Sequence, residues 1–168
     1  MEIRDAVPED APAACAVLRR SIAELCAADH GNDPGLLERW LANKTPEAVA
    51  SWIAHPGGSV LLAVEGGAVL GVGAVTHAGE ITLNYVSPDA RFRGVSRALL
   101  RALEARAAER GNSRFTLKST ETARRFYRSA GYAEEGAPAG EFGTLSGHPM
   151  SKRLEAVGTA GAAGPRPS

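Results

Sequence analysis

The most informative stretch of the sequence is residues 86–100, VSPDARFRGVSRALL, which joins an expected strand to an expected helix through a basic turn. The first turn of a helix leaves backbone N–H groups unpaired and carries the positive end of the helix dipole, so it attracts phosphate. Gly94 and Ser96 are small enough to let a phosphate approach the backbone. Positive charge is added by Arg91, Arg93 and Arg97. The turn therefore predicts an anion site.

Other motifs fit this stretch less well. Residues 94–98, GVSRA, imitate the nucleophile elbow of hydrolases, but Ser87–Arg93 separate them from the strand that should directly precede such an elbow. The Gly-x-x-x-x-Gly-Lys-Ser/Thr pattern of a nucleotide P-loop is absent from the sequence, and Gly71-Val72-Gly73 has Thr76 where a Rossmann fingerprint has its third glycine. A solvated basic turn before a surface helix remains the alternative.

Hydrophobic periodicity on both sides of the turn predicts alternating helices and strands. Strands are expected at Glu2–Ala6, Val60–Val64, Val69–Thr76, Glu80–Val86, Arg114–Lys118 and His148–Leu154, with further strand pieces from Tyr132 onward. Helices are expected at Asp10–Ala27, Leu36–Leu41, Gly94–Arg110 and Glu121–Ala130, and another between a Thr45 cap and His55. The three central strands follow one another through short turns, which indicates an antiparallel meander.

Length and composition indicate one globular domain. The chain has 168 residues, of which 44% are hydrophobic and 23% charged. Equal numbers of basic and acidic residues, 19 of each, argue against a nucleic-acid-binding surface. The longest apolar run, Ser59–Val64, is far shorter than the roughly 20 residues of a membrane helix, and no leader is evident, so we expect no membrane partner and a cytoplasmic location.

Two smaller features complete the composition. Cys15 and Cys26 have the spacing of neither a metal site nor a redox pair, and we expect both to be buried helix residues. Residues 155–168 contain no large apolar side chain except Val157. We therefore expect a folded domain at residues 1–154 and a disordered C-terminal tail at 155–168.

Two motifs together make the sequence resemble the GNAT N-acetyltransferase superfamily. The family pattern Gln/Arg-x-x-Gly-x-Gly/Ala is matched by Arg91–Ser96, with serine in the last place. The family pattern Asn-x-x-Ala-x-x-Phe/Leu-Tyr, followed by Gly-Phe/Tyr, is matched by Thr120–Tyr127 and Gly131-Tyr132, with threonine in place of asparagine. The order of the expected elements also follows the family.

The resemblance implies an α/β (α+β mixed) fold, with a central mixed, mostly antiparallel, splayed β-sheet of six to seven strands flanked by helices. Acetyl-CoA would lie between the strands Glu80–Val86 and Arg114–Lys118, and backbone groups near Asn84 and Val86 would hold its pantetheine arm. The residues that the resemblance implies for binding acetyl-CoA are Asn84, Val86, Arg91, Arg93, Gly94, Val95, Ser96, Arg97, Thr120 and Phe126. No metal is expected.

The reaction implied is direct transfer of an acetyl group from acetyl-CoA to a primary amine in a ternary complex, through a tetrahedral intermediate. Tyr127 matches the family tyrosine near the sulfur and is the candidate general acid. Glu80 is the candidate general base, acting directly or through water, and the backbone N–H of Val86 would bind the thioester carbonyl. A core aromatic at Tyr127 and a solvated strand end at Glu80 remain alternatives.

The acceptor pocket is expected from the segment Ala27–Trp40 and from the C-terminal strands. Asp29, His30, Asp33 and Glu38 give that segment an acidic character that suits a cationic amine, with a solvated turn as the alternative. His148 is a further candidate from the last strand, with a structural role as its alternative. We expect a small-molecule or amino-acid-like amine acceptor, with protein N termini or lysines as the alternative, and a homodimer is common in the family. Two other functions stay open: a CoA-sensing module without turnover, and a partner-binding domain anchored by Trp40 and Trp52.

Overall fold

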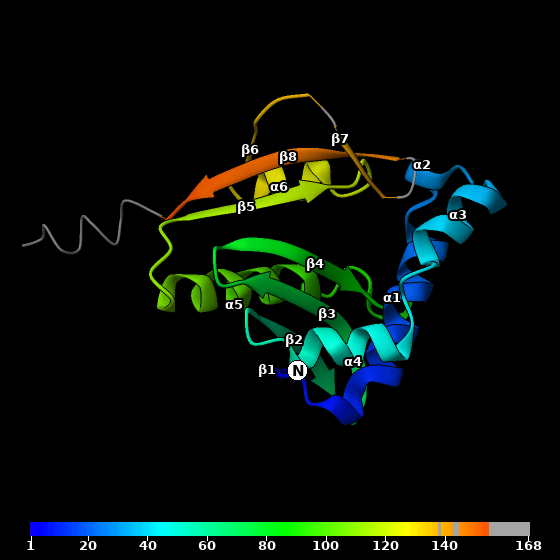
Figure 1. Ribbon diagram of the computed structural model, residues 1–168, viewed down its shortest axis with the longest axis horizontal. Coiled ribbons are helices and arrows are strands. Elements are labelled where there is room, and N and C mark those ends of the chain that lie inside the picture. Colours follow the sequence, from blue (N-terminus) through cyan, green and yellow to red (C-terminus); the bar gives the residue numbers. More distant parts are fainter. Residues whose placement is uncertain (138, 143–144, 155–168) are drawn as a thin grey trace, which may run out of the picture.

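The computed structural model describes residues 1–137, 139–142 and 145–154, and the tail expected at 155–168 lies outside them (Figure 1). The strands are β1 Glu2–Asp5, β2 Gly58–Glu65, β3 Ala68–Thr76, β4 Glu80–Val86, β5 Arg114–Ser119, β6 Ala133–Glu134, β7 Ala139–Phe142 and β8 Leu145–Arg153. The α-helices are α1 Ala11–Leu25, α2 Ala27–His30, α3 Pro34–Leu41, α4 Pro46–Ala54, α5 Val95–Glu109 and α6 Arg124–Ser129. Side chains cap two of these helices as expected for their residue types, Asp33 on α3 and Thr45 on α4.

The strands form a sheet in the order β1-β2-β3-β4-β5-β8-β6, and β7 pairs additionally with β8. Every neighbouring pair in it is antiparallel except β4 and β5. This confirms the expected mixed, mostly antiparallel sheet, including its seven-stranded path. β7 was expected only as a strand piece after Tyr132.

The sheet splays between β4 and β5. These two strands share only the register pairs Glu80–Thr116 and Ile81–Leu117, and beyond them the strands diverge, with β5 and β8 leading away from β4 toward α2 (Figure 1). On its other side β4 carries a bulge, because Ala74 faces Leu83 while Val75 faces Ile81, which leaves Thr82 as the extra residue. The expected splay is thus confirmed.

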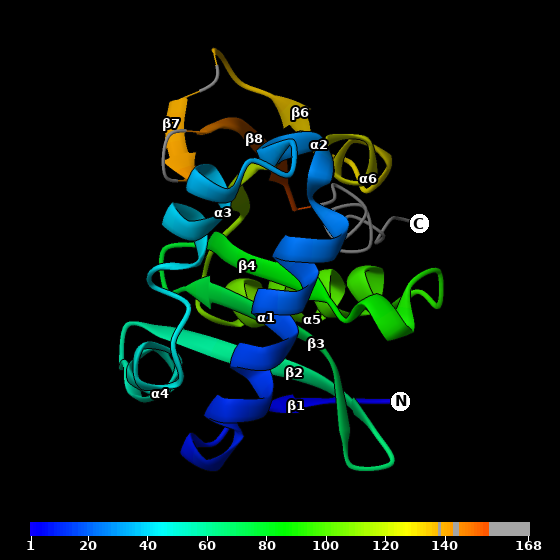
Figure 2. The same ribbon diagram turned by 90° about the vertical axis from the view of Figure 1, so that its right-hand side faces the viewer.

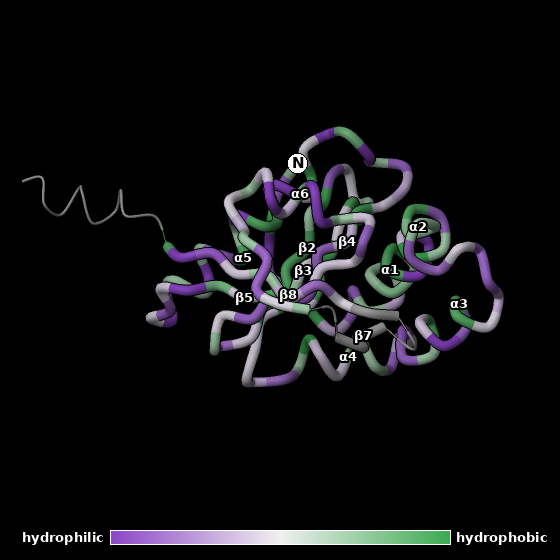
Figure 3. Tube along the Cα trace, turned by 90° about the horizontal axis from the view of Figure 1, so that it is seen from above, coloured by the Kyte–Doolittle hydropathy of each residue, from purple (hydrophilic) through white to green (hydrophobic). Residues whose placement is uncertain are grey.

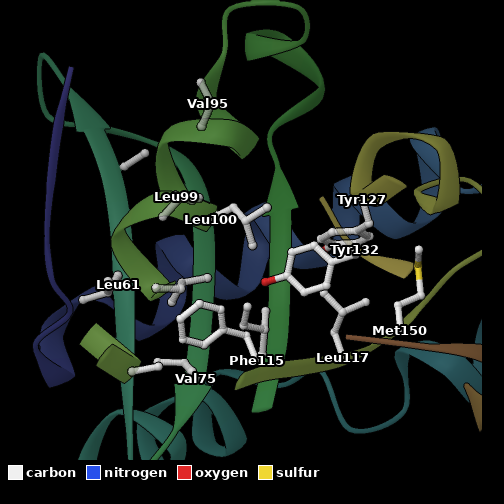
Figure 4. Close-up of a cluster of buried hydrophobic side chains, with 14 of the residues drawn as sticks. Leu61, Val75, Val95, Leu99, Leu100, Phe115, Leu117, Tyr127, Tyr132 and Met150 are labelled. Atoms are coloured by element: carbon white, nitrogen blue, oxygen red, sulfur yellow. The ribbon is translucent and has the colours of Figure 1, made fainter. Parts of the chain in front are cut away.

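Helices cover both faces of the sheet (Figure 2). The face with α1 and α4 buries a cluster that includes Leu18, Val49 and Val72, and the face with α5 buries one that includes Leu99 and Phe115 (Figure 4). Hydrophobic stretches gather around β2 and β3, and hydrophilic stretches lie on the outer turns (Figure 3). Burial of these apolar faces is the main favourable contribution to folding.

The close approach of α5 to the sheet depends on two glycines of β3. A Cβ atom at Gly71 would lie 2.7 Å from Leu99 Cδ1, and one at Gly73 would lie 2.8 Å from Leu103 Cδ1. A side chain at either position would require these leucine side chains or the helix to shift. The glycines therefore set the depth at which α5, and the turn before it, sits on the sheet.

Several expected boundaries were wrong. The first long helix ends at Leu25 rather than Ala27, and a separate α2 follows it. The last strand begins at Leu145 rather than His148. Helix α6 begins at Arg124 rather than Glu121, because the N–H groups of Glu121 and Thr122 donate to the carboxylate of Asp29 instead of leading into the helix. The expected burial of Cys15 and Cys26 is confirmed.

Candidate functional site

Two adjoining pockets occupy the region where β4 and β5 diverge. The outer pocket has a volume of about 280 Å³ and the inner one of about 40 Å³. Both are lined by Asn84, Tyr85, Thr120, Ala123 and Tyr127, so they lie next to each other. The outer pocket is also lined by Ser21, Leu25, Cys26, Val86, Arg91, Phe92, Ser96, Thr122 and Phe126. The inner pocket is bounded by Ile81–Tyr85 on β4 and by Leu117–Thr120 at the end of β5.

Backbone groups of β4 face this space. The N–H of Ser87 donates to the carbonyl oxygen of Leu70 on β3. Because successive residues of a strand direct their N–H and C=O groups alternately to opposite sides, those of Val86 and Asn84 are directed away from β3. At Asn84 and Val86, β4 is no longer paired with β5. An extended ligand with amide groups can therefore pair with β4 at these residues.

The turn before α5 adopts an unusual backbone conformation. Gly94 has φ of +79°, and Phe92 has φ of +63°, a region that L side chains rarely occupy. No side chain within the described residues caps α5. The first-turn N–H groups of α5 are thus available to an anion next to the outer pocket. The strained conformation of Phe92 marks this turn as a functional segment.

The predicted phosphate-binding arginines have different environments. Arg93 donates to the Glu65 carboxylate at 2.7 Å, so its charge is already partly compensated. Arg91 lies with its guanidinium 4.6 Å from the ring centre of Phe92, a side chain that is 93% exposed. Arg97 donates to the Ser129 hydroxyl at 3.0 Å and lies 5.4 Å from the ring centre of Phe126. Aromatic rings therefore orient Arg91 and Arg97.

Tyr127 is 6% exposed and lines both pockets (Figure 4). Burial raises the pKa of Tyr127 to about 12, against the opposing effect of a hydrogen bond from the Asn84 side chain. Its ring contacts those of Phe126 and Tyr132, at centroid distances of 5.1 and 5.7 Å, and the Tyr132 hydroxyl donates to Glu104 at 2.7 Å. The pocket thus contains a rigidly packed, neutral phenol that can donate a proton.

Asn84 links β4 to α5. Its side-chain nitrogen donates to the carbonyl oxygen of Ser96 at 3.4 Å, and its buried Oδ1 has no hydrogen-bond partner within the described part of the chain. An unpaired buried carbonyl oxygen costs free energy unless a ligand or a water donates to it. Asn84 therefore offers an acceptor to an N–H group of a bound molecule.

Glu80, the candidate base, lies at the other end of β4. It faces Thr116 in the paired part of the strands, and its carboxylate is 4.0 Å from the Lys118 ammonium. It lines neither pocket. The structure therefore does not bring Glu80 and Tyr127 together. The other predicted residues outside the two linings are Arg93, Gly94, Val95 and Arg97, which belong to the turn and first helical turn of α5.

Asp29, expected to contact a cationic acceptor, instead joins two parts of the fold. Its carboxylate accepts the N–H groups of Glu121 and Thr122 at 2.6 and 3.1 Å and the Thr122 hydroxyl at 2.5 Å. α2 is thereby tied to the turn that follows β5. Thr120, in the same turn, accepts the N–H of Ala123 through its side-chain oxygen at 3.1 Å, a bond within the turn that precedes α6.

The other expected acceptor residues have structural roles. His30 is 1% exposed, with Nε2 2.9 Å from the Ile22 carbonyl oxygen and Nδ1 accepting the N–H of Asn32 at 3.0 Å, so it lines no pocket. Asp33 caps α3. Glu38 lies in a separate groove between α1 and α3. His148 lies 3.1 Å from the Glu121 carboxylate. Neither His30 nor Asp33 therefore lines the inner or the outer pocket.

The two tryptophans do not form an exposed anchor pair. Trp40 is 2% exposed and belongs to a buried cluster with Ile22 and Cys26, and Trp52 packs against the cluster beneath α1 and α4. A partner-binding surface built on Trp40 is excluded by its burial.

The sequence prediction missed part of the pocket lining. Ser21, Leu25 and Cys26 reach the outer pocket from α1, and Tyr85 reaches it from β4. Burial raises the pKa of the Cys26 thiol to about 12, so it stays neutral. In the sequence Ser21, Leu25 and Cys26 belong to an ordinary amphipathic helix and its end, and Tyr85 to an ordinary strand, so they carry no signal of a pocket.

Two searches of the described residues gave no site of another class. No group of three or more His, Cys, Asp or Glu side chains in them is arranged to hold a metal ion. None of the helices they form is both long and apolar enough to span a membrane.

Comparisons with known proteins agree with this geometry. The family model of the acetyltransferase (GNAT) domain matches residues 26–154. A GCN5-related N-acetyltransferase from Rhodopseudomonas palustris is 28% identical, with a TM-score of 0.82 over 91% of this chain and 95% of that one. PaiA N-acetyltransferase from Thermoplasma acidophilum, solved with coenzyme A, is 18% identical, with a TM-score of 0.77 over 91% and 98%.

A third solved structure extends the comparison. A ribosomal-protein-alanine N-acetyltransferase from Brucella melitensis is 26% identical, with a TM-score of 0.62 over 92% of this chain and 100% of that one. No curated protein matches the chain significantly.

Proposed function

Because the chain belongs to the GNAT acetyltransferase family, we propose that it transfers an acetyl group from acetyl-CoA to the primary amine of a small-molecule or amino-acid-like acceptor. The observation that carries the proposal is that the outer pocket is lined by a buried neutral phenol, Tyr127, and has the uncapped N-terminus of α5 at its edge. The phenol can protonate a departing thiolate, and the helix N-terminus can bind a diphosphate.

The residues present fit acetyl-CoA. The first turn of α5 and Arg91 would hold the diphosphate, and Gly94, Val95 and Ser96 keep that approach open. The backbone of Asn84 and Val86 and the unpaired Asn84 Oδ1 would hold the amide groups of the pantetheine arm. Thr120 and Phe126 line the opposite wall. Acetyl-CoA supplies the activated acetyl group.

The protein's own groups would assist the transfer in three ways. The backbone N–H of Val86 would donate to the thioester carbonyl. Tyr127 would hold its proton until the sulfur leaves and then donate it. Glu80 would accept the amine's proton through water, because it lies outside the pocket lining and cannot be placed beside Tyr127 directly.

The size of the inner pocket favours a narrow acceptor molecule. The inner pocket is small, about 40 Å³, and Thr120 in its wall precedes the turn that Asp29 ties to α2. These restraints favour a narrow primary amine over a folded protein surface. An exposed protein N-terminus is the second candidate, because a solved structure 26% identical to this chain is a ribosomal-protein-alanine N-acetyltransferase.

Calorimetry and a turnover assay test the proposal. Titration with acetyl-CoA should give saturable binding, and release of free CoA should follow addition of at least one member of a panel of amines, amino acids and N-terminal peptides. Saturable binding with no turnover across the panel would favour a CoA sensor. Absence of any binding heat at millimolar ligand would contradict both functions.

Replacement of Tyr127 by Phe tests the general acid. We expect kcat to fall by about 10²- to 10⁴-fold, the usual contribution of a positioned proton donor, while the Kd for acetyl-CoA stays within twofold. Tyr132→Phe is the matched control, because it removes a phenol that donates to Glu104 and lines neither pocket. Unchanged kcat in Tyr127→Phe would remove the phenol from the mechanism.

A further inference from the structure

A groove between the end of α4 and the sheet has no part in the functions proposed so far. Its volume is about 170 Å³, and its lining includes Trp52 and His55 from the end of α4, Val60 of β2 and Ala74 of β3. It lies on the face of the sheet that α1 and α4 cover (Figure 2). This space, called the α4 groove below, is therefore largely apolar and contains two rings.

The α4 groove adjoins the inner pocket at one residue. Thr82, the extra residue of the bulge in β4, lines both spaces. Leu83, which follows it, packs against the cluster beneath α1 and α4. A molecule in the inner pocket that extends past Thr82 would therefore also occupy the α4 groove.

Glu80 lies beside both spaces, although it lines neither of them. Its N–H donates to the side-chain oxygen of Thr76 at 3.1 Å, and Thr76 lines the α4 groove. Its carboxylate is 4.0 Å from the ammonium of Lys118, which lines the inner pocket. An acceptor that extends past Thr82 would thus lie near the candidate base.

The size and walls of the α4 groove suit one compact apolar group. An apolar cavity of about 150 Å³ can hold a benzene ring. The His55 ring is held against Gly57, because its Nδ1 accepts the N–H of Gly57 at 2.9 Å and a Cβ atom at Gly57 would lie 2.8 Å from its Cε1. Trp52 provides a second aromatic wall, and aromatic rings pack favourably against one another. The α4 groove therefore fits an aromatic ring or a branched aliphatic group.

The charges around the two spaces favour an acceptor with a single amine. Among the described residues that line the α4 groove, none is acidic. The carboxylate of Glu80, which lies between the two spaces, already faces the Lys118 ammonium. A second ammonium placed in the α4 groove would lose water without gaining a carboxylate partner, which costs free energy.

We propose that the acceptor is a primary monoamine whose narrow amine end enters the inner pocket and whose aromatic or other compact apolar group binds in the α4 groove. Trp52 and His55 are then specificity-determining residues. This proposal rests on the proposed function, because it names the class of acceptor for the same reaction. It also gives a reason for the position of Glu80, which lies between the two parts of such a molecule.

Rates of CoA release from acetyl-CoA with matched amines test the proposal. The first pair is 2-phenylethylamine and ethylamine, which share a primary amine and differ by the ring. The wild type should show a kcat/KM at least about tenfold higher for 2-phenylethylamine, because even one added methylene in a fitting apolar pocket gives about 10- to 200-fold. The second pair is 1,4-diaminobutane and butylamine, and the diamine should be the poorer substrate because of its second ammonium.

Variants of the groove test whether it causes the preference for the ring. Trp52→Ala and His55→Ala should each bring the two kcat/KM values to within about threefold of each other, whereas Trp52→Phe keeps an aromatic wall and should keep most of the ratio. His55 is exposed, so its variant should fold even if Trp52→Ala, at a position packed against the α1 and α4 cluster, is less stable. Ser51→Ala, at an exposed position of α4 that does not line the groove, is the matched control and should keep the wild-type ratio.

The outcomes separate this proposal from the one it rests on. The α4 groove is not the acceptor site, while the proposed function stands, if the wild type acetylates other amines but prefers ethylamine or shows no preference, or if His55→Ala and Trp52→Ala keep the wild-type ratio. A preference for 1,4-diaminobutane over butylamine would overturn the assignment to a monoamine. If no amine causes release of CoA, the proposed function itself fails.

Discussion

At the residue scale, the surroundings of Tyr127 decide its chemistry. A tyrosine in water has a pKa of about 10, whereas burial raises the pKa of Tyr127 to about 12. The pKa of Tyr127 is therefore higher in the folded protein than in the unfolded chain. Its phenol stays mostly protonated in the folded protein at every pH below the folded-state pKa. Tyr127 therefore remains a proton donor over the range in which enzymes usually work.

This environment predicts a particular pH dependence. With a rapidly deprotonated acceptor amine, kcat should show no descending limb between about pH 8 and pH 10.5, because the phenol stays protonated there. An unshifted tyrosine would lose half of its protonated form near pH 10. The pH–rate profile should be measured with circular dichroism at each pH as the folding control. A descending limb centred near pH 10 in folded protein would contradict the assignment.

The residues differ in how well the sequence predicted them. Tyr127, Thr120 and Ser96 follow from local motifs whose spacing is independent of the rest of the fold, and all three line the outer pocket. The hydrogen bonds of Asp29 to the turn after β5 were not predicted, because its partner Thr122 is 93 residues away in the sequence. No local sequence pattern can indicate a contact between residues so far apart in the sequence. Glu80 lies outside the pockets because β4 pairs with β5 at that residue and diverges only after it.

At the scale of elements, the hydrogen bonds of Asp29 hold α2 against the turn before α6. Asp29→Asn leaves one acceptor oxygen and turns the other into an NH₂ group that faces donors. We expect the free energy of unfolding to fall by about 1–2 kcal/mol, and the Kd for acetyl-CoA to rise, because Thr120 and Thr122 line the outer pocket. Urea denaturation and calorimetry measure the two effects.

Asp33→Asn is the matched control for this variant. Asp33 caps α3 by accepting the N–H of Gly35 at 2.8 Å, and asparagine caps helices about as well as aspartate does. The control should therefore leave both quantities close to those of the wild type. If Asp29→Asn behaved like Asp33→Asn, the link between α2 and the turn would have no energetic importance.

The packing of α5 on β3 gives a second prediction at this scale. Gly73→Ala places a methyl group 2.8 Å from Leu103 Cδ1, so the Leu103 side chain or α5 must shift, and we expect a loss of about 1–3 kcal/mol in the free energy of unfolding. Gly35→Ala is the contrasting substitution, because Gly35 lies in α3, where alanine meets only ordinary contacts and favours the helix. Thermal or urea unfolding should move in opposite directions for the two variants, and equal shifts would contradict the packing argument.

The order of the elements was predictable from periodicity, but several of their ends were not. The central meander and the long helix after the basic turn follow from runs whose apolar spacing is unambiguous. The bulge at Thr82 was not predicted. Because of it, Ile81 and Asn84, which are three residues apart, both lie on the side of the sheet that α5 covers. Ile81 belongs to the cluster beneath α5, and the Asn84 side chain donates to Ser96. A strict alternation along β4 would have assigned them to opposite faces.

At the scale of the whole molecule, the fold consists of two arms on either side of the splay. One arm contains β1–β4 with α1–α5, and the other contains β5–β8 with α6. The sheet joins them through only two register pairs of β4 and β5. The arms also share the buried cluster that contains Leu99 and Phe115, and polar links between them include those from Asp29 to Thr122, from Arg97 to Ser129 and from Glu104 to Lys152. A ligand that contacts both arms adds to this limited set.

Coenzyme A should therefore stabilise the folded protein measurably. At a free concentration of 100 times its Kd, binding to the folded state alone adds about 2.7 kcal/mol to the free energy of unfolding, which corresponds to a rise of about 5–10 °C in the thermal midpoint of a domain of this size. Hydrogen exchange should slow at the amides of Asn84 and Val86, whose N–H groups face the space between the arms. Adenosine at the same concentration is the control, because it lacks the pantetheine arm and the phosphates. A raised midpoint without slower exchange on β4 would place the ligand elsewhere, and no rise at saturation would mean that the two arms are not bridged by it.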